Sequence, residues 1–100
     1  MAAEEVMPEK KIMGRFFDML SKEPNKVTYG LEEVKKQLEM GSVEVVLVSE
    51  AMDDDVIEQL EDMASTMNSE VMIISVDTRE GVQLRDMGKI VAILRYEVHA

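Results

Sequence analysis

Three stretches of this chain carry side chains that could do chemistry, and the first is the run Asp53-Asp54-Asp55. Its carboxylates could ligate a divalent cation, which needs several oxygens converging on one point. Consecutive residues of a helix diverge by about 100° each, so these three carboxylates would not converge. The same run is typical of a helix start, with Asp53 as the N-cap and two acids where the helix dipole favours negative charge. We expect a helix N-terminus here and not a metal site.

The second stretch, Asp77–Gly81, follows an apolar run and opens a helical pattern, which is where open α/β sheets bind ligands and anions. It lacks a glycine-rich phosphate loop, and the carboxylates of Asp77 and Glu80 would repel a phosphate. A helix capped by Thr78, with Gly81 as a permissive position in its first turns, is the simpler interpretation. A small-molecule enzyme using this junction is kept as an alternative, which a polar pocket at the junction would favour.

Acid–base and nucleophilic chemistry has few candidates in this sequence. His99 is the only histidine and lies one residue from the end, where a general base has neither a fixed position nor an orienting partner. Ser49 and Ser75 end apolar runs, but no histidine is placed to activate either hydroxyl. Without cysteine the chain has no thiolate nucleophile and no disulfide. We therefore expect no catalytic site, no metal and no cofactor.

The elements that position these residues alternate between helical and extended patterns. Periodicity predicts helices over residues 10–20, 31–39, 53–68 and 78–87, and strands over residues 27–29, 43–48, 71–76 and 90–98. The run Val43–Val48 is almost unbroken, as expected of a strand covered on both faces. This alternation predicts an α/β fold, a three-layer α/β/α sandwich whose mixed sheet of about four strands has helices on both faces. Residues 1–9 are expected to be a flexible tail or linker remnant, and residues 10–100 a single α/β partner-binding domain.

The charge of the chain limits its partners. A formal net charge of −10 disfavours nucleic-acid binding, because phosphate contacts need clustered lysines and arginines. No apolar run approaches the roughly 20 residues of a membrane span, and the first eleven residues are too polar for a secretory signal. We expect a cytoplasmic chain with no direct nucleic-acid or membrane contact. Both a basic protein partner and a merely solvated acidic face agree with this charge.

Two further groups of residues admit more than one role. Ten methionines are unusual, and methionine both fills irregular core gaps and forms adaptable contact surfaces. Core filling is expected for the methionines on apolar stripes, namely Met13, Met40, Met63, Met67, Met72 and Met87. Arg95 and Tyr96 follow the last apolar run, and these residue types are favoured at interface hot spots. An edge strand whose tyrosine packs on the first helix is the equally weighted alternative.

Four stretches together carry a resemblance to a known family. They are Glu9–Asp18 (EKKIMGRFFD), Tyr29–Val34 (YGLEEV), Leu38–Glu44 (LEMGSVE) and Ile93–Tyr96 (ILRY). With the sequence between them they resemble, over residues 9–98, the C-terminal domain of the class-1 peptide chain release factors of archaea and eukaryotes. The ribosome-rescue protein Pelota shares this domain and is the close alternative, although the EKKIMGRFFD opening is more similar to the release factors.

The resemblance implies a function in translation termination. It implies that this chain corresponds to the third domain of such a factor, which binds a translational GTPase of the elongation-factor type and the ABC-type recycling ATPase, and reaches the ribosome through the full-length factor. Stop-codon reading and GGQ-dependent peptidyl-tRNA hydrolysis would belong to other domains. The implied fold is an α/β/α sandwich related to a kink-turn-binding ribosomal protein. An RNA-binding module is therefore a further alternative, which the charge opposes.

The implied GTPase contact can be carried over to matching positions of this sequence. These lie in the first helix and the last strand: Ile12, Gly14, Arg15, Phe16, Phe17, Asp18, Ile93, Leu94, Arg95 and Tyr96. Two departures from the family pattern are visible. Release factors usually insert a minidomain after the VLVSE strand, whereas a short connection without cysteine joins Glu50 to Asp55 here. The family also often has two glycines before the last strand, whereas Lys89 follows Gly88 here.

Overall fold

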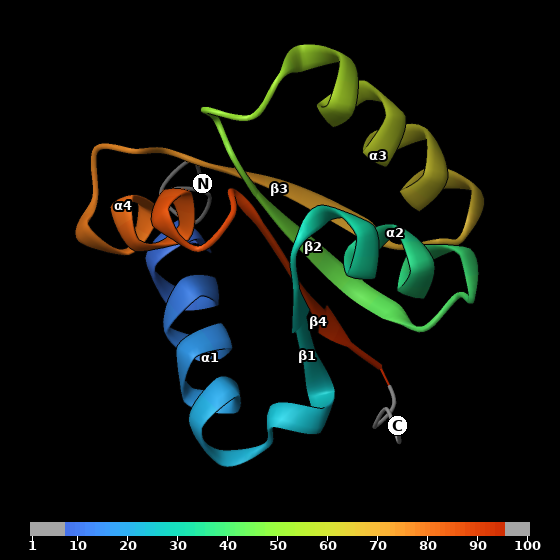
Figure 1. Ribbon diagram of the computed structural model, residues 1–100. Coiled ribbons are helices and arrows are strands. Elements are labelled where there is room, and N and C mark those ends of the chain that lie inside the picture. Colours follow the sequence, from blue (N-terminus) through green and yellow to red (C-terminus); the bar gives the residue numbers. More distant parts are fainter. Residues whose placement is uncertain (1–7, 96–100) are drawn as a thin grey trace, which may run out of the picture.

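A four-stranded sheet lies between two pairs of helices in the part of the chain that the structure describes (Figure 1). The structure is a computed structural model that describes residues 8–95, with side chains from residue 11. The helices are α1 (Pro8–Lys22), α2 (Leu31–Glu39), α3 (Asp54–Thr66) and α4 (Arg79–Asp86), with a short 3-10 helix η2 (Pro24–Lys26). The strands are β1 (Val27–Tyr29), β2 (Val43–Ser49), β3 (Glu70–Ile74) and β4 (Ile90–Leu94).

The strand order in the sheet is β1-β4-β2-β3. Strand β4 runs antiparallel to both of its neighbours, β1 and β2, whereas β2 and β3 are parallel. The sheet is therefore mixed, and the predicted α/β fold with four strands and helices on both faces is confirmed.

The boundaries follow local rules that the sequence shows. Gly30 (φ 94°) and Gly41 (φ 72°) bracket α2 in the left-handed region, where glycine has no steric penalty. The hydroxyl of Thr78 accepts a hydrogen bond from the amide of Gly81 at 2.9 Å, so the predicted cap of α4 is confirmed. Asp53 is the N-cap residue of α3, as predicted, but its side chain makes no capping hydrogen bond.

Several predicted ends differ from the structure: α3 ends at Thr66 and not at residue 68, β3 ends at Ile74 and not at residue 76, and further differences occur in α1 and β4. Helix α1 begins at Pro8, two residues before the predicted start, and proline is well accepted at the first helical position because its missing N–H is not needed there. Strand β4 ends at Leu94, whereas the prediction continued it to residue 98. Residues 96–98 of that strand, and residues 1–7 of the predicted tail, lie outside the described residues.

A β-bulge at Glu44 sets which side chains of β2 face each layer. Val43 pairs with Leu94 of β4, and Val45 pairs with the adjacent Ile93, so two steps along β2 match one along β4. Glu44 is the extra residue, and its side chain is exposed. Beyond the bulge the residues of β2 alternate between the two faces of the sheet, as the pleat requires.

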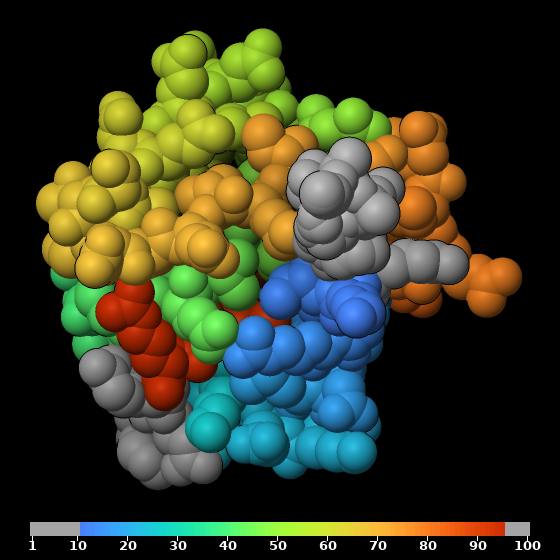
Figure 2. Space-filling model, turned by 180° about the vertical axis from the view of Figure 1, so that it is seen from behind, coloured from blue at the N-terminus to red at the C-terminus, as the bar shows by residue number. Residues whose placement is uncertain are grey.

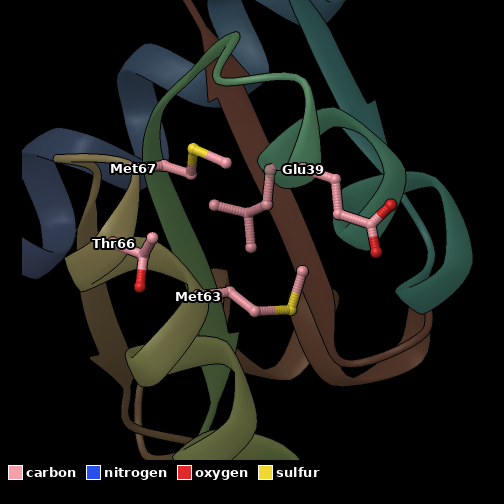
Figure 3. A pocket seen from close by; sticks show the side chains of 5 residues that line it. Glu39, Met63, Thr66 and Met67 are labelled. Carbon is pink, nitrogen blue, oxygen red and sulfur yellow. The ribbon is translucent and has the colours of Figure 1, made fainter.

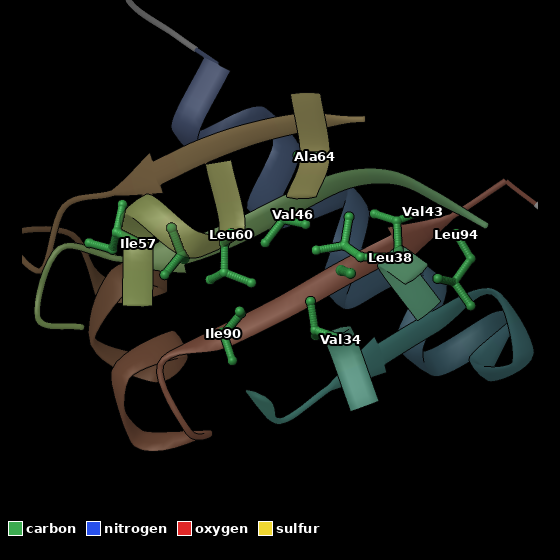
Figure 4. Packing of buried hydrophobic residues seen from close by; sticks show 11 residues of the cluster. Val34, Leu38, Val43, Val46, Ile57, Leu60, Ala64, Ile90 and Leu94 are labelled. Atoms are coloured by element: carbon green, nitrogen blue, oxygen red, sulfur yellow. The ribbon is translucent and has the colours of Figure 1, made fainter. Parts of the chain in front are cut away.

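Each face of the sheet has its own apolar cluster. The α2/α3 layer covers an aliphatic cluster, in which Val34 and Leu38 of α2 and Leu60 of α3 meet Val46 and Ile90 of the sheet (Figure 4). The α1/α4 layer covers a second cluster, built of Met13, Phe16, Val27, Val45, Leu47, Ile74, Leu84, Val91 and Ile93. The two clusters explain the unbroken apolar run of β2, because both of its faces are covered.

The predicted core role of the methionines is confirmed for some positions and wrong for another. Met13 is fully buried, and Met72 and Met87 are partly buried against the α1/α4 cluster. Met40 is wrong, because its side chain is 67% exposed at the C-terminal end of α2. Met40 still has helical backbone angles, but it lies about 200° around the helix from Leu38, on the side away from the sheet.

Candidate partner-binding surface

The structure divides the ten predicted contact residues into three groups. Phe16, Ile93 and Leu94 are buried in the core, so their side chains do not reach the surface; Phe16 and Ile93 lie in the α1/α4 cluster and Leu94 in the α2/α3 cluster. Ile12 and Phe17 are half-buried, and the remaining described positions are exposed: Gly14, Arg15, Asp18 and Arg95. Tyr96 lies outside the described residues. The exposed positions are the ones through which a partner could make direct contact.

The two adjacent phenylalanines of α1 have different environments. Phe16 is fully buried, whereas Phe17 packs against the edge of the same cluster. Their rings meet edge to face, with centroids 5.4 Å apart and an angle of 68° between the planes. Successive residues of a helix point about 100° apart, so only one ring of the pair can be directed into the core.

Arg15 forms a bidentate ion pair with Glu44. Its two terminal nitrogens donate hydrogen bonds to the two carboxylate oxygens of Glu44 at 3.1 and 3.0 Å. The β-bulge exposes Glu44, and the pair joins the outer side of α1 to the start of β2. Sequence reasoning missed Glu44, although a signal was present, since it is the one charged residue within the apolar run Val43–Val48.

Arg95 is exposed but held in place by two hydrogen bonds. Its backbone amide donates to the carbonyl oxygen of Ser42 at 2.7 Å. Its guanidinium donates to the carbonyl oxygen of Asn68 at 2.5 Å, in the turn between α3 and β3. Asn68 has a φ of 62°, a conformation that asparagine tolerates better than most residues. A fixed guanidinium loses less conformational entropy when it binds a carboxylate than a mobile one would.

The two arginines belong to one side of the molecule. Strands β2 and β4 are antiparallel, and the amide of Arg95 bonds to Ser42, which lies two residues before Glu44 of β2. Figure 2 shows the start of β2 in green between α1 in blue and the end of β4 in red. We call the exposed residues Arg15, Glu44 and Arg95 the Arg15–Arg95 surface. It presents two guanidinium groups and one carboxylate.

Residues 8–95 contain neither a cluster of metal ligands nor a membrane-spanning helix. No group of three or more histidine, cysteine, aspartate or glutamate side chains is arranged there to hold a metal ion. None of the helices in this range has the length and apolar character needed to cross a membrane.

The fold and the positions of its motifs define a C-terminal domain of the kind found in peptide chain release factors. The C-terminal domain of a peptide chain release factor from Methanosarcina mazei superposes with a TM-score of 0.86 at 27% identity, over 95% of this chain and 86% of that one. The chain belongs to the family described as eRF1 domain 3, which it matches over residues 6–98. The resemblance seen in the sequence motifs is thereby confirmed.

Relatives of two kinds match this chain. The protein pelota homolog of Methanobrevibacter smithii is 36% identical over 96 residues, which cover 93% of this chain and 27% of the relative. The peptide chain release factor subunit 1 of Thermococcus sibiricus is 30% identical over 141 positions, which cover 94% of this chain and 34% of the relative. The chain therefore spans about a third or less of the length of these relatives.

The alignments with these two relatives differ in length. The Thermococcus release factor contributes over forty positions that this chain lacks, whereas the Pelota alignment is nearly as long as the chain itself.

Among solved structures, Dom34 of S. cerevisiae superposes with a TM-score of 0.78 at 25% identity, over 98% of this chain and 28% of that one. That protein is described as a translation termination-like factor interacting with Hbs1.

Proposed function

We propose that this domain recruits protein partners for a translation factor of the release factor and Pelota family, and that the Arg15–Arg95 surface binds a translational GTPase of the elongation-factor type. The observation that carries this proposal is the position of the two exposed arginines. Each lies in one of the stretches, EKKIMGRFFD and ILRY, through which the chain resembles its family. The interaction of yeast Dom34 with Hbs1 supports a partner-binding role for proteins that contain this fold.

The chemistry of the surface agrees with a charged protein partner. Exposed guanidinium groups recognise carboxylates through paired hydrogen bonds, and Arg is enriched at interface hot spots. Arg15 is half-exposed and its two terminal nitrogens are bonded to Glu44, so a partner carboxylate would share this guanidinium with Glu44 or take the place of Glu44. The ABC-type recycling ATPase is proposed as a second partner of the domain, and the ribosome as a partner of the full-length factor.

Charge reversal at Arg95 tests the proposal. The chain is titrated by calorimetry with the elongation-factor GTPase of Methanobrevibacter smithii bound to GTP. Arg95→Glu is expected to weaken binding by roughly tenfold or more, because it replaces attraction by repulsion at the contact. Arg85→Glu is the matched control, since Arg85 is an exposed arginine of α4 outside the surface. Equal binding by both variants, or no binding by the unmodified chain, would contradict the proposal.

The loss of binding can be separated from a loss of folding. The side chains of Arg15 and Glu44 are 46% and 45% exposed, so removing their ion pair costs at most about 1 kcal/mol of stability. Arg15→Ala is therefore expected to remain folded in thermal unfolding and still bind the GTPase more weakly. Phe17→Ala needs the same folding control, because this ring contributes to the core.

We propose that the full-length factor to which this domain belongs is a release factor. One observation favours Pelota as the second candidate. That observation is the near absence of gaps in the Pelota alignment. Two chimeras separate the candidates, one in which this chain replaces the C-terminal domain of the M. smithii release factor and one in which it replaces that of Pelota. Stop-codon-dependent peptide release retained only by the first would support the release factor, and ribosome rescue retained only by the second would support Pelota.

A further inference from the structure

An apolar cavity of about 150 Å³ opens between the C-terminal turns of α2 and α3. It lies in the layer opposite to α1 and is lined by Leu38, Glu39, Met63, Thr66 and Met67. Figure 3 shows the side chains of Met63 and Met67 extending from α3 toward α2. The volume suits a single ring or branched side chain, since an apolar cavity of about this size in another protein binds benzene. We call these five residues the α2/α3 groove.

The groove is built from side chains that adapt to a ligand. Met63 and Met67 are half-buried, and the sulfur of Met67 lies beside Gly41. Methionine has three rotatable bonds and a polarisable sulfur, so a lining rich in methionine can repack around different apolar groups. Grooves of this kind between two helices recognise the apolar stripe of a third helix.

Charge decides which class of ligand can reach the groove. Helix α3 carries five carboxylates, those of Asp54, Asp55, Glu58, Glu61 and Asp62, and no lysine or arginine. Its negative dipole end adjoins the groove without a basic residue in the last turn, and Glu39 stands on the opposite rim. On α2, Lys35 and Lys36 offset part of this charge, but the surroundings stay acidic. A second copy of this chain, an anionic membrane and a nucleic acid would all be repelled.

We propose that the α2/α3 groove binds a basic amphipathic helix of a protein partner. One apolar side chain of that helix enters the cavity between Met63 and Met67. Lysines or arginines on its flanks pair with Glu39 and with the carboxylates of α3. This site goes beyond the proposed GTPase contact and does not depend on it, because the groove shares no residue with the Arg15–Arg95 surface.

A synthetic peptide tests the proposal directly. The probe is a helix of about 18 residues made of leucine, lysine and alanine, with leucines at spacings of three and four; this length is enough for helix formation. The chain is labelled with ¹³C at its methionine methyl groups. Saturable binding is expected to move the signals of Met63 and Met67, whereas those of Met19 and Met87 on the other layer stay in place. Shifts at Met19 and Met87 instead, or no saturable shift at Met63 and Met67, would overturn the proposal.

A matched pair of tryptophan substitutions locates the anchor. Thr66→Trp places a ring at the exposed rim of the cavity, whereas Ser65→Trp places the same ring one residue away, pointing about 100° around the helix. The first is expected to weaken peptide binding by roughly tenfold and the second to leave it nearly unchanged. Equal affinities for the two variants would contradict insertion into the groove. The dispersion of the methionine signals shows that each variant is folded.

The contribution of charge is tested in the same titration. Glu39→Lys and Glu33→Lys change the net charge equally, but only Glu39 lines the groove. A larger loss of affinity is expected for Glu39→Lys than for Glu33→Lys. Higher salt is expected to weaken the binding of the peptide to both variants. A peptide with serines in place of the leucines is expected to lose the shifts of Met63 and Met67. If that peptide binds as tightly as the probe, the interaction is only electrostatic and the proposed apolar anchor is wrong.

Discussion

The α1/α4 layer and the α2/α3 layer cover opposite faces of one sheet with different kinds of side chain. The α2/α3 cluster is made of valine, leucine, isoleucine and alanine alone among its buried members. The α1/α4 cluster contains the larger Phe16 and Met13, with Phe17 at its edge. Both clusters are closely packed, so the two layers are expected to contribute comparably to stability.

The outer surfaces of the layers differ more than their interiors. On α1, Lys22 pairs with Asp18 at 3.3 Å, and Arg15 pairs with Glu44 of β2, so charges of both signs are present. On α3 every charged residue is acidic. A helix stabilised mainly by its buried face can tolerate such repulsion, because packing provides most of its stability. The core of this fold therefore does not restrict the charge of its surfaces. The two surfaces are free to specify different partners.

The largest expected effect comes from removing one large side chain from each layer. Phe16→Ala is expected to lower the free energy of unfolding by ~3–5 kcal/mol, and Leu60→Ala by ~2–5 kcal/mol, because both side chains are fully buried. Urea unfolding followed by circular dichroism measures both. A cost below about 1 kcal/mol for either variant would show that its layer is packed less tightly than the other, which would break the equivalence of the two layers.

Replacing two helical glycines of the α1/α4 layer with alanine is expected to give the next largest changes in stability, and these changes have opposite signs. A Cβ atom on Gly81 would clash with the carbonyl oxygen of Ser75, so Gly81→Ala is expected to cost ~1–3 kcal/mol or more. A Cβ atom on Gly14 meets nothing within 4 Å, so Gly14→Ala is expected to stabilise the protein by ~0.5–1 kcal/mol. Thermal unfolding of the two variants measures the difference. If Gly81→Ala also stabilises, the first turn of α4 does not approach Ser75, in the connection after β3, as closely as the structure shows.

The smallest effect tests the charge difference between the layers. Glu58 has only carboxylates at the four neighbouring positions of its helix, namely Asp54, Asp55, Glu61 and Asp62. Glu58→Lys converts four repulsions into attractions of ~0.2–0.5 kcal/mol each at most, so a stabilisation of about 1 kcal/mol is expected. The midpoint of urea unfolding at low salt measures it. An unchanged midpoint would show that the acidic surface of α3 has no cost.

The equivalent change on α1 is the control for that measurement. Lys22→Glu replaces the favourable pair with Asp18 by a repulsion, so it is expected to destabilise by about 0.5 kcal/mol. Both effects should shrink at high salt, because exposed charges are screened. A stabilisation by Lys22→Glu would contradict the described difference between the two helices.

The sequence by itself determined the fold class and the order of the elements. The apolar run Val43–Val48 required a strand covered on both faces, and Gly30 and Gly41 marked the ends of α2. Thr78 identified the start of α4, since a hydroxyl at that position accepts a hydrogen bond from a free amide of the first helical turn. These features are local, because the hydrogen bonds and backbone angles involved lie within a few residues. The motifs EKKIMGRFFD and ILRY likewise indicated the family before the fold was known.

Only the tertiary structure decided which of these residues reach the surface and where they meet. Phe16 and Phe17 are adjacent in the helical pattern, and only packing against the sheet selected Phe16 for the core. Gly81 was interpreted as permissive, whereas the close approach of Ser75 leaves no room for any larger residue.

The two proposed binding surfaces could likewise not be predicted from the sequence. The bulge that turns Glu44 toward Arg15 depends on the register between β2 and β4. The groove beside Met63 and Met67 exists because the ends of α2 and α3 lie next to each other. An apolar stripe reports that one side of a segment is covered, but it does not report which distant segment covers it or what space the two leave between them.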